Sequence, residues 1–404
     1  MKKKNVGHGS TPAKVSNVSK VDSVAYANAG VSLSAGDVFS AFAGEIGKKS
    51  FNNSRFVQVC DFSKGHFRGP RGWQYVGLPN GWFNVVAPDG IGTATIIISA
   101  AGEHRTASSR LLAMTAGDIT RYGGLPLVFT NILETKTLDD PGSSIFEAYK
   151  SMMVGMGNYA KDQGYVLMGG ETAEMGVCVS GEIIGPSAIF TPTYNWSGVM
   201  SGVNHPDKVI NGNTLKAGQR VIALRDALRS NGGSMMRKYF RTRFNDHWWL
   251  HLDAQEYIKA AAAPAALYDR FLAEMNGWYD GDFQPIVKMH AIAHISGGGI
   301  HSKFAEDILF PRGLSALLDN LWEPPSFMSD CVRDMAISDK EAYTIFNGGQ
   351  GALVVVDEGV AKGFCICANE HGIEARPAGV ILKKSKNPRV EIVSKFTGKT
   401  FAFK

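Results

Sequence analysis

Hydrophobic and polar positions along this chain follow two periods, one typical of helices and one typical of strands. Apolar residues recur at three- and four-residue spacing over residues 108–121 and 145–163, which predicts two amphipathic helices. Short apolar runs bounded by Gly or Pro predict buried strands over residues 93–101 and 125–133. A further short strand over residues 165–168 is expected to end at a glycine pair.

The same alternation continues in the second half of the chain. Strands are expected at 219–224, 289–295, 352–356, 378–382 and 390–393, and helices at 234–240, 254–275, 300–309 and 359–371. Pro264 falls inside one of these helices and should break or kink it. The loose stretch 191–206, rich in Asn, Ser, Gly and Pro, is the predicted domain boundary. The pattern therefore predicts an α/β (α+β) fold with two domains, 21–204 and 205–404, after a flexible basic arm at 1–20.

Composition narrows the class of protein. The chain has 404 residues, of which 44% are hydrophobic and 20% charged, as in ordinary globular proteins. A net charge of +5 is too thinly spread for nucleic-acid binding to be expected. Five scattered cysteines without a CxxC pair fit neither a disulfide framework nor a zinc ribbon, so a reducing cytoplasm is expected. The longest apolar runs are strand-sized, and no membrane span is expected.

Glycine is the most unusual part of the composition, at 46 of 404 residues, and it gathers with polar residues in four segments. Carboxylates spread over loops can hold Mg²⁺ together with phosphate oxygens. Glycines let backbone N–H groups approach a phosphate, most favourably at a helix N-terminus. Each segment alone is also explained by a tight turn, and neither a P-loop nor a GxGxxG fingerprint is present. The segments are Asp89-Gly90-Ile91-Gly92-Thr93, Gly117-Asp118, Gly169-Gly170-Glu171-Thr172-Ala173-Glu174 and Ser296-Gly297-Gly298-Gly299.

Two histidines and two loops are further candidates. His290 and His294 share one face of a predicted strand. Their spacing resembles a zinc-protease pair, but the Glu beside the first His is missing, so a core or substrate-facing role is favoured. Helix capping alone would explain the Ser-Asn-Gly at 230–232. The stretch 62–84 interleaves aromatic and basic residues, which suits a surface loop or hairpin better than base stacking.

Taken in order, these segments resemble the aminoimidazole ribonucleotide synthetase family, the phosphoribosylformylglycinamidine cyclo-ligases. GGETAEM at 169–175 and HAIAHxxGGG at 290–299 are the specific motifs. The collinear matches run from Tyr26 to Val393 and cover most of the chain. The supporting motifs lie at 25–31, 89–93, 230–232 and 346–351.

The resemblance implies a homodimer whose N-terminal domains join strands into a shared barrel, with a larger α/β C-terminal domain. Residues 21–204 would bind ATP and metal and form the dimer, and 205–404 would bind substrate and phosphate. ATP would phosphorylate the formamide oxygen of formylglycinamidine ribonucleotide to an iminophosphate, and an amidine nitrogen would then close the imidazole ring. Mg²⁺ would neutralise the transferring phosphoryl group. The setting would be cytoplasmic purine biosynthesis, with small nucleotide substrates and a second copy as partners.

The resemblance also gives each candidate residue an expected role. Asp89, Asp118 and Glu171 match family positions that hold metal and phosphates. The expected catalytic residues are His294, which matches a family substrate-site histidine, Asp118 and Asn231. The expected contacts of ATP and phosphate are Asp89, Gly90, Gly92, Thr93, Gly169, Gly170, Gly297, Gly298 and Gly299.

Several polar family residues are replaced in this chain. Losing a cationic partner of a phosphate costs on the order of 1.5–3 kcal/mol per contact. Arg229 or the basic loop 64–71 is expected to compensate. Two alternatives stay open: a relative that phosphorylates another acceptor, and a catalytically silent dimer, against which the intact carboxylates count. The replacements are Ala27-Asn28 for Lys-Asp, Ala94 for Lys, Gly117 for Asn, Arg229 for His, Gly233 for Tyr, and Pro264-Ala265-Ala266 for Pro-Thr-Arg.

Overall fold

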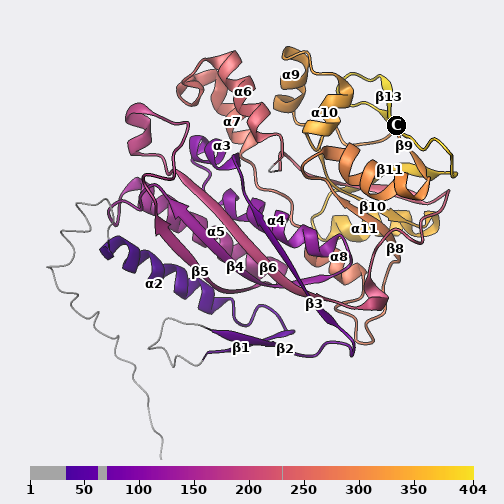
Figure 1. The fold of residues 1–404 in the computed structure, drawn as a ribbon, viewed down its shortest axis with the longest axis horizontal. Helices are drawn as coiled ribbons and strands as arrows, with labels where there is room; N and C mark the ends of the chain where they lie inside the picture. Colours follow the sequence, from indigo (N-terminus) through magenta and orange to yellow (C-terminus); the bar gives the residue numbers. More distant parts are fainter. Residues whose placement is uncertain (1–32, 62–70, 230) are drawn as a thin grey trace, which may run out of the picture.

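Three β-sheets organise the chain in the computed structural model, which describes residues 33–61, 71–229 and 231–404 (Figure 1). The predicted arm at 1–20 and most of the basic loop lie outside the described residues. A two-stranded sheet pairs β1 (Val57–Cys60) with β2 (Gly72–Tyr75). A four-stranded sheet has the order β3-β6-β4-β5, formed by β3 (Phe83–Gly90), β4 (Leu125–Thr135), β5 (Val166–Glu174) and β6 (Tyr194–Asn204).

The third sheet has seven strands in the order β13-β12-β9-β11-β7-β10-β8. Every strand before residue 205 belongs to the two smaller sheets, and every described strand from residue 220 onward belongs to this one. The predicted α/β fold with two parts is therefore confirmed. The strands are β7 (Arg220–Arg225), β8 (Met289–His294), β9 (Ser315–Leu318), β10 (Gln350–Val356), β11 (Ala375–Leu382), β12 (Val390–Val393) and β13 (Thr400–Phe403).

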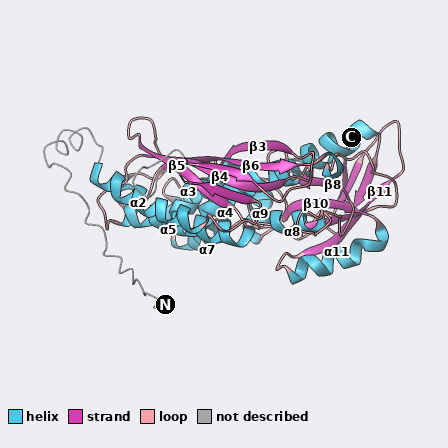
Figure 2. Cartoon of the chain, turned by 90° about the horizontal axis from the view of Figure 1, so that it is seen from below, coloured by secondary structure: helices cyan, strands magenta, loops and turns pink. Residues whose placement is uncertain are grey.

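Helices cover one face of the four-stranded sheet, as Figure 2 shows from below. Among the described residues, no helix is long and apolar enough to cross a membrane. The 254–275 segment is two short helices, because the chain breaks around Pro264 as expected. The helices are α2 (Leu33–Lys49), α3 (Ala94–Ala101), α4 (Thr106–Thr120), α5 (Ser144–Gln163), α6 (Gly233–Phe244), α7 (Gln255–Ala261), α8 (Asp269–Met275), α9 (Ser326–Asp334), α10 (Asp339–Ile345) and α11 (Glu358–Glu370).

Two of the sequence predictions were wrong. The apolar run 93–101 forms helix α3, which ends at Gly102 in a left-handed conformation and packs against α4, α6 and α7. A short helix buried on most sides has no polar face, so its sequence cannot be distinguished from that of a buried strand. The loose stretch 191–206 contains β6, an internal strand of the four-stranded sheet. Its small residues permit close packing, as at Gly198, where a Cβ would lie 2.4 Å from the Phe129 ring.

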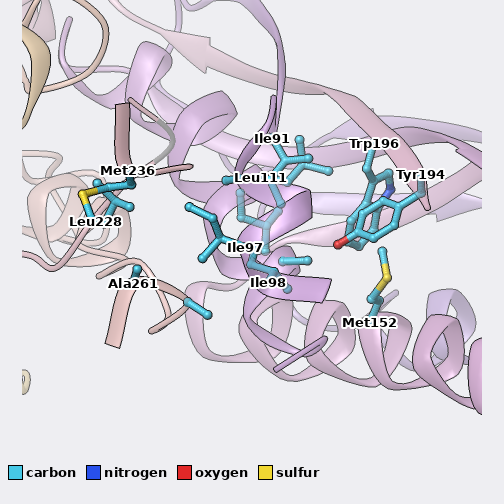
Figure 3. Packing of buried hydrophobic residues seen from close by; sticks show 14 of the residues in the cluster. Ile91, Ile97, Ile98, Leu111, Met152, Tyr194, Trp196, Leu228, Met236 and Ala261 are labelled. Carbon is cyan, nitrogen blue, oxygen red and sulfur yellow. The ribbon is translucent and has the colours of Figure 1, made fainter. Parts of the chain in front are cut away.

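One hydrophobic cluster contains residues from both halves of the chain. Figure 3 shows Ile97, Leu111 and Trp196 from the first half in the same cluster as Met236 and Ala261 from the second. Helices α6 and α7 of the second half therefore pack against the elements of the first half in this cluster.

A fully buried arginine joins these halves at the centre of α4. The Arg110 guanidinium donates hydrogen bonds to the backbone carbonyls of Arg229 (3.1 Å), Ala261 and Ala263 (2.9 Å). All three carbonyls belong to the second half of the chain. No water can replace these donors at a side chain that is 0% exposed.

We predict that Arg110→Met lowers the free energy of unfolding by about 2–4 kcal/mol, because three buried carbonyls lose their donor. Denaturant unfolding would measure the change. Arg333→Met is the matched control, since that side chain is 66% exposed and its ion pairs should contribute less than about 1 kcal/mol. Equal losses in the two variants would contradict a joining role for Arg110.

Candidate functional site

Strand alternation brings Asp89 toward α4. Along β3, Val86 is 68% exposed and Ala87 is 7% exposed, so Asp89 shares the covered face with Ala87. Helix α4 packs on β3 and carries Asp118 in its last turn. Burial raises the pKa of Asp89 and the Asp118 carboxylate adds to this effect, so the two carboxylates are close enough to interact. The predicted association of these two residues is consistent with this geometry.

His294 reaches the same place from the other sheet. It is the last residue of β8, and its Nδ1 lies 3.8 Å from Oδ1 of Asp118. The ring is 1% exposed, and neither ring nitrogen has a hydrogen-bond partner among the described residues. A buried imidazole with two unpaired nitrogens beside a carboxylate is available to bind a ligand group.

Gly117 explains how this ring fits. A Cβ at position 117 would lie 2.5 Å from both Nδ1 and Cε1 of His294. The imidazole therefore stacks directly on the backbone of α4, and any larger residue at 117 would displace it. The absence of a side chain at Gly117 therefore lets the histidine approach the helix backbone.

The pKa values of the three site residues are shifted in different directions. Burial, together with the charge of Arg229, lowers the pKa of His294 to about 4, so the imidazole is neutral at pH 7. Burial raises the pKa of Asp118, but His294, Arg121 and Lys303 outweigh it and lower the pKa overall. Burial is the main cause of the raised pKa of Asp89. A neutral imidazole of this kind is a hydrogen-bonding group rather than a strong general base.

The carboxylates Asp89 and Asp118 fit Mg²⁺, which takes one or two carboxylates and completes its shell with waters and phosphate oxygens. Within the described ranges, no group of three His, Cys, Asp or Glu side chains could hold a metal ion.

Glu171 does not join these two carboxylates within one chain, which corrects the predicted three-residue metal site. In the sheet, Glu171 pairs with Ile132 of β4. Ile132 pairs with Ser197 of β6, and Ser197 pairs with Gly90 of β3, the neighbour of Asp89. Directly paired residues share a face, so Glu171 lies on the exposed face with Ile132, opposite to Asp89. Three strand spacings, roughly 14 Å, also separate β3 from β5.

Gly169 and Gly170 were expected in a loop, but they lie within β5 itself. A Cβ at Gly170 would lie 2.8 Å from the Asn131 side chain, so close strand packing already requires a glycine there. Both glycines are exposed at an edge of the sheet. Their role in phosphate binding stays a prediction, because β5 lies at the opposite edge of the sheet from β3, which carries Asp89.

The triple-glycine turn follows His294 and opens a helix as expected. The helix begins at Gly299, where a Cβ would lie 2.0 Å from the backbone carbonyl oxygen of Tyr343. Gly297 is exposed, with no atom near the position of a Cβ. The turn therefore presents open backbone beside His294, as an anion site requires.

Two loops from different halves meet at the start of α3. Thr93 Oγ1 lies 3.3 Å from Ser234 Oγ, and Gly92 and Thr93 are exposed ahead of the helix. In the neighbouring loop, the Asn231 amide donates to the Ile345 carbonyl (3.2 Å), whereas its Oδ1 is buried without a partner. This contact gives Asn231 a structural role at the edge of the site, and its catalytic role stays a prediction.

Arg229 does not supply a free cation, which corrects the expected compensation. Its guanidinium is 1% exposed and donates to Asp226 (2.9 Å) and to the Tyr268 hydroxyl (2.6 Å). Asp226 in turn accepts from the backbone N–H of Ala266 (3.0 Å). The arginine thus fills the space beside the Ala265-Ala266 segment and is used within the protein.

His290 lies away from the site. It occupies the other end of β8, where its Nδ1 is 2.7 Å from Thr214 Oγ1 and its Nε2 is 3.2 Å from Asp357. The favoured reading of a core histidine fits this position. Lys303, in contrast, affects both site carboxylates and was not predicted, because no motif marks it.

Comparison with known proteins agrees with this two-part α/β architecture. The model of the family "AIR synthase related protein, N-terminal domain" matches residues 74–189, and that of the C-terminal domain matches 270–390. A phosphoribosylformylglycinamidine cyclo-ligase of Nitrosospira multiformis is 30% identical over 275 residues, covering 67% of this chain and 70% of the relative. One of Staphylococcus carnosus is 27% identical over 309 residues, covering 76% and 82%. The chain belongs to the AIR synthase related family.

Solved structures share the fold at low sequence identity. Escherichia coli HypE has a TM-score of 0.55 at 13% identity, covering 90% of this chain and 96% of that chain. A thiamine-monophosphate kinase from Stenotrophomonas maltophilia has a TM-score of 0.52 at 13% identity, covering 83% and 98%. HypE in complex with ATP has a TM-score of 0.54 at 11% identity, covering 81% and 86%.

We predict that Gly117→Ala turns the His294 ring out of its position, since the new methyl group would overlap it. Overpacking should lower the free energy of unfolding by about 1–3 kcal/mol, and imidazole NMR signals should report the changed ring environment. Gly363→Ala on α11 is the matched control, because a Cβ there meets no atom. An unchanged His294 signal in Gly117→Ala would contradict the predicted contact.

The pH dependence of stability should reveal the neutral histidine. Between pH 6.5 and 4 the unfolded chain binds a proton at His294 that the folded chain does not, so folding weakens as the pH falls. Relative to His294→Gln, the wild type should lose up to about 3 kcal/mol across this window. Urea unfolding at several pH values would measure it, and a pH-independent difference would show that His294 titrates normally.

Proposed function

We propose that this protein performs the ATP-dependent ring closure of formylglycinamidine ribonucleotide to aminoimidazole ribonucleotide. The observation that carries the proposal is the convergence of Asp89, Asp118 and His294 beside the triple-glycine turn. The names of the curated relatives, phosphoribosylformylglycinamidine cyclo-ligases, support the same reaction. The ATP named in the HypE complex supports a nucleotide site in this fold.

The residues of the site suit the two chemical requirements of this reaction. Asp89 and Asp118 would hold Mg²⁺, which when bound neutralises charge on a transferring phosphoryl group. The neutral His294 would hydrogen-bond the formamide or amidine group and orient it for intramolecular attack. The backbone at 297–299 and the start of α3 at Thr93 would bind phosphates of the substrate and of ATP.

The proposal assigns a role to each half of the chain. Residues 21–204 would bind ATP and metal and form a homodimer, and 205–404 would bind substrate phosphate. The outer face of the four-stranded sheet exposes Val86 (68%), Ile132 (47%) and Val199 (37%), which favours its burial against a second copy. Glu171 lies on that same face and would then belong to the dimer surface.

One observation favours a second candidate, an ATP-using relative that phosphorylates a different amide or small acceptor. The Arg229 guanidinium is buried and pairs with Asp226, and Ala94, Ala265 and Ala266 offer no charge. Fewer cationic contacts suit an acceptor that differs from the family substrate.

We predict that the purified protein converts MgATP and formylglycinamidine ribonucleotide into ADP and aminoimidazole ribonucleotide. Asp118→Asn should lower kcat/KM at least about 100-fold, because charge stabilisation of the phosphoryl group is lost. Glu256→Gln on α7 is exposed and is the control, with activity expected to stay near that of the wild type. ADP without the imidazole product would favour the second candidate, and neither product from the folded protein would overturn the ring closure.

A further inference from the structure

A backbone carbonyl of β10 holds the chain directly after His294. The N–H of Ile295, the next residue, donates to the Gly351 carbonyl near the start of β10 (3.0 Å). His294 itself pairs with Ala352 in the ladder between β8 and β10. The position of the Gly351 carbonyl therefore helps to fix the backbone from which the imidazole projects.

The same carbonyl accepts a second hydrogen bond, from a buried tyrosine. The Tyr268 hydroxyl donates to the Gly351 carbonyl (2.7 Å), and its oxygen accepts from Nη1 of Arg229 (2.6 Å). Both side chains pack on the glycine, since a Cβ at position 351 would lie 2.9 Å from Arg229 Nη1 and 3.0 Å from Tyr268 Cε1. Both are 1% exposed, so solvent cannot replace these hydrogen bonds.

Arg229 continues this chain of hydrogen bonds to helix α4. Its Nη2 donates to the Ala113 carbonyl (3.3 Å), one helical turn before Gly117. Gly117 is the residue against which the His294 ring packs. The Asp226 carboxylate, 2.9 Å from Arg229, balances the buried charge. The hydrogen bonds therefore join the two backbone segments between which the imidazole lies.

We infer that Tyr268 and Arg229 are positioning residues, which fix the separation of β8 from α4 and so place the His294 imidazole for its ligand. The ring depends on such a frame because neither of its nitrogens has a hydrogen-bond partner among the described residues. The inference gives Arg229 a role that needs no contact with a phosphate. Its effect on turnover rests on the proposed ring closure, whereas its effect on the position of the ring does not.

The inference predicts that Tyr268→Phe changes the environment of the His294 ring. The variant keeps the buried aromatic ring and removes only the hydroxyl, so the protein should stay folded. The imidazole NMR signals of His294, assigned by their absence in His294→Gln, should move. The kcat of ring closure should fall about 10-fold, with the KM for ATP within about twofold of the wild type, because the ring is displaced while the nucleotide contacts stay.

Tyr149→Phe is the matched control. The Tyr149 hydroxyl is also buried and also donates to a backbone carbonyl, that of Thr193 (3.2 Å), but both residues lie in the first half of the chain. This variant should leave the His294 signals and kcat unchanged.

Arg229→Lys tests the same contacts from the other side. An ammonium lacks the planar fork with which the guanidinium reaches Tyr268 and Ala113 together, so the His294 signals should move in this variant also. Should Tyr268→Phe fail to fold, unchanged signals in folded Arg229→Lys would overturn the inference.

The outcomes separate this inference from the proposed function. His294 signals that stay unchanged in folded Tyr268→Phe, or that move equally in Tyr149→Phe, would overturn the positioning role, as would an unchanged kcat. A wild-type protein that forms no imidazole product, with signals that move in Tyr268→Phe alone, would support the positioning role and overturn the ring closure.

Discussion

The site depends on how one buried arginine fixes helix α4 between the two halves of the chain. Arg110 binds three carbonyls of the second half. Two turns further along the same helix lies Asp118, whose position relative to β8 determines whether the carboxylate and His294 meet. A guanidinium without water around it holds its partners rigidly, because the alternative is several unsatisfied polar groups. The relative placement of Asp118 and His294 therefore depends on hydrogen bonds made by a residue outside the site.

The alternation of side chains in the four-stranded sheet also limits which carboxylates can meet. It places Asp89 on the covered face and Glu171 on the exposed face, although both belong to glycine-rich segments of the sequence. A carboxylate can help to bind a cation in one chain only if its strand parity and its neighbours allow it. Sequence motifs alone do not carry this information, since parity across a sheet depends on registers set by residues far apart in the chain.

Much of the fold could be predicted from the sequence, and the failures have physical reasons. Long periodic segments such as α4 and α5 were predicted correctly, because one apolar stripe faces a sheet over several turns. The α3 run was misassigned because a helix buried on most sides has no polar face to show the helical period. Strand β6 was misassigned because its small residues, which permit close packing, are also typical of loops. The sequence named Asp118 and His294 as site residues, and the structure places them 3.8 Å apart. The close approach of His294 to Gly117 and the pairing of Arg229 with Asp226 did not follow from motifs, because the fold alone brings these residues together.

The contact between His294 and Gly117 has a consequence for how such a site can diverge. The imidazole packs directly against the backbone at Gly117, so the size of the residue at 117 determines the distance between the ring and the helix. A chain that carries Asn there must seat the imidazole differently. The position of the imidazole can thus change through a substitution at 117, so changes at 117 and 294 are coupled.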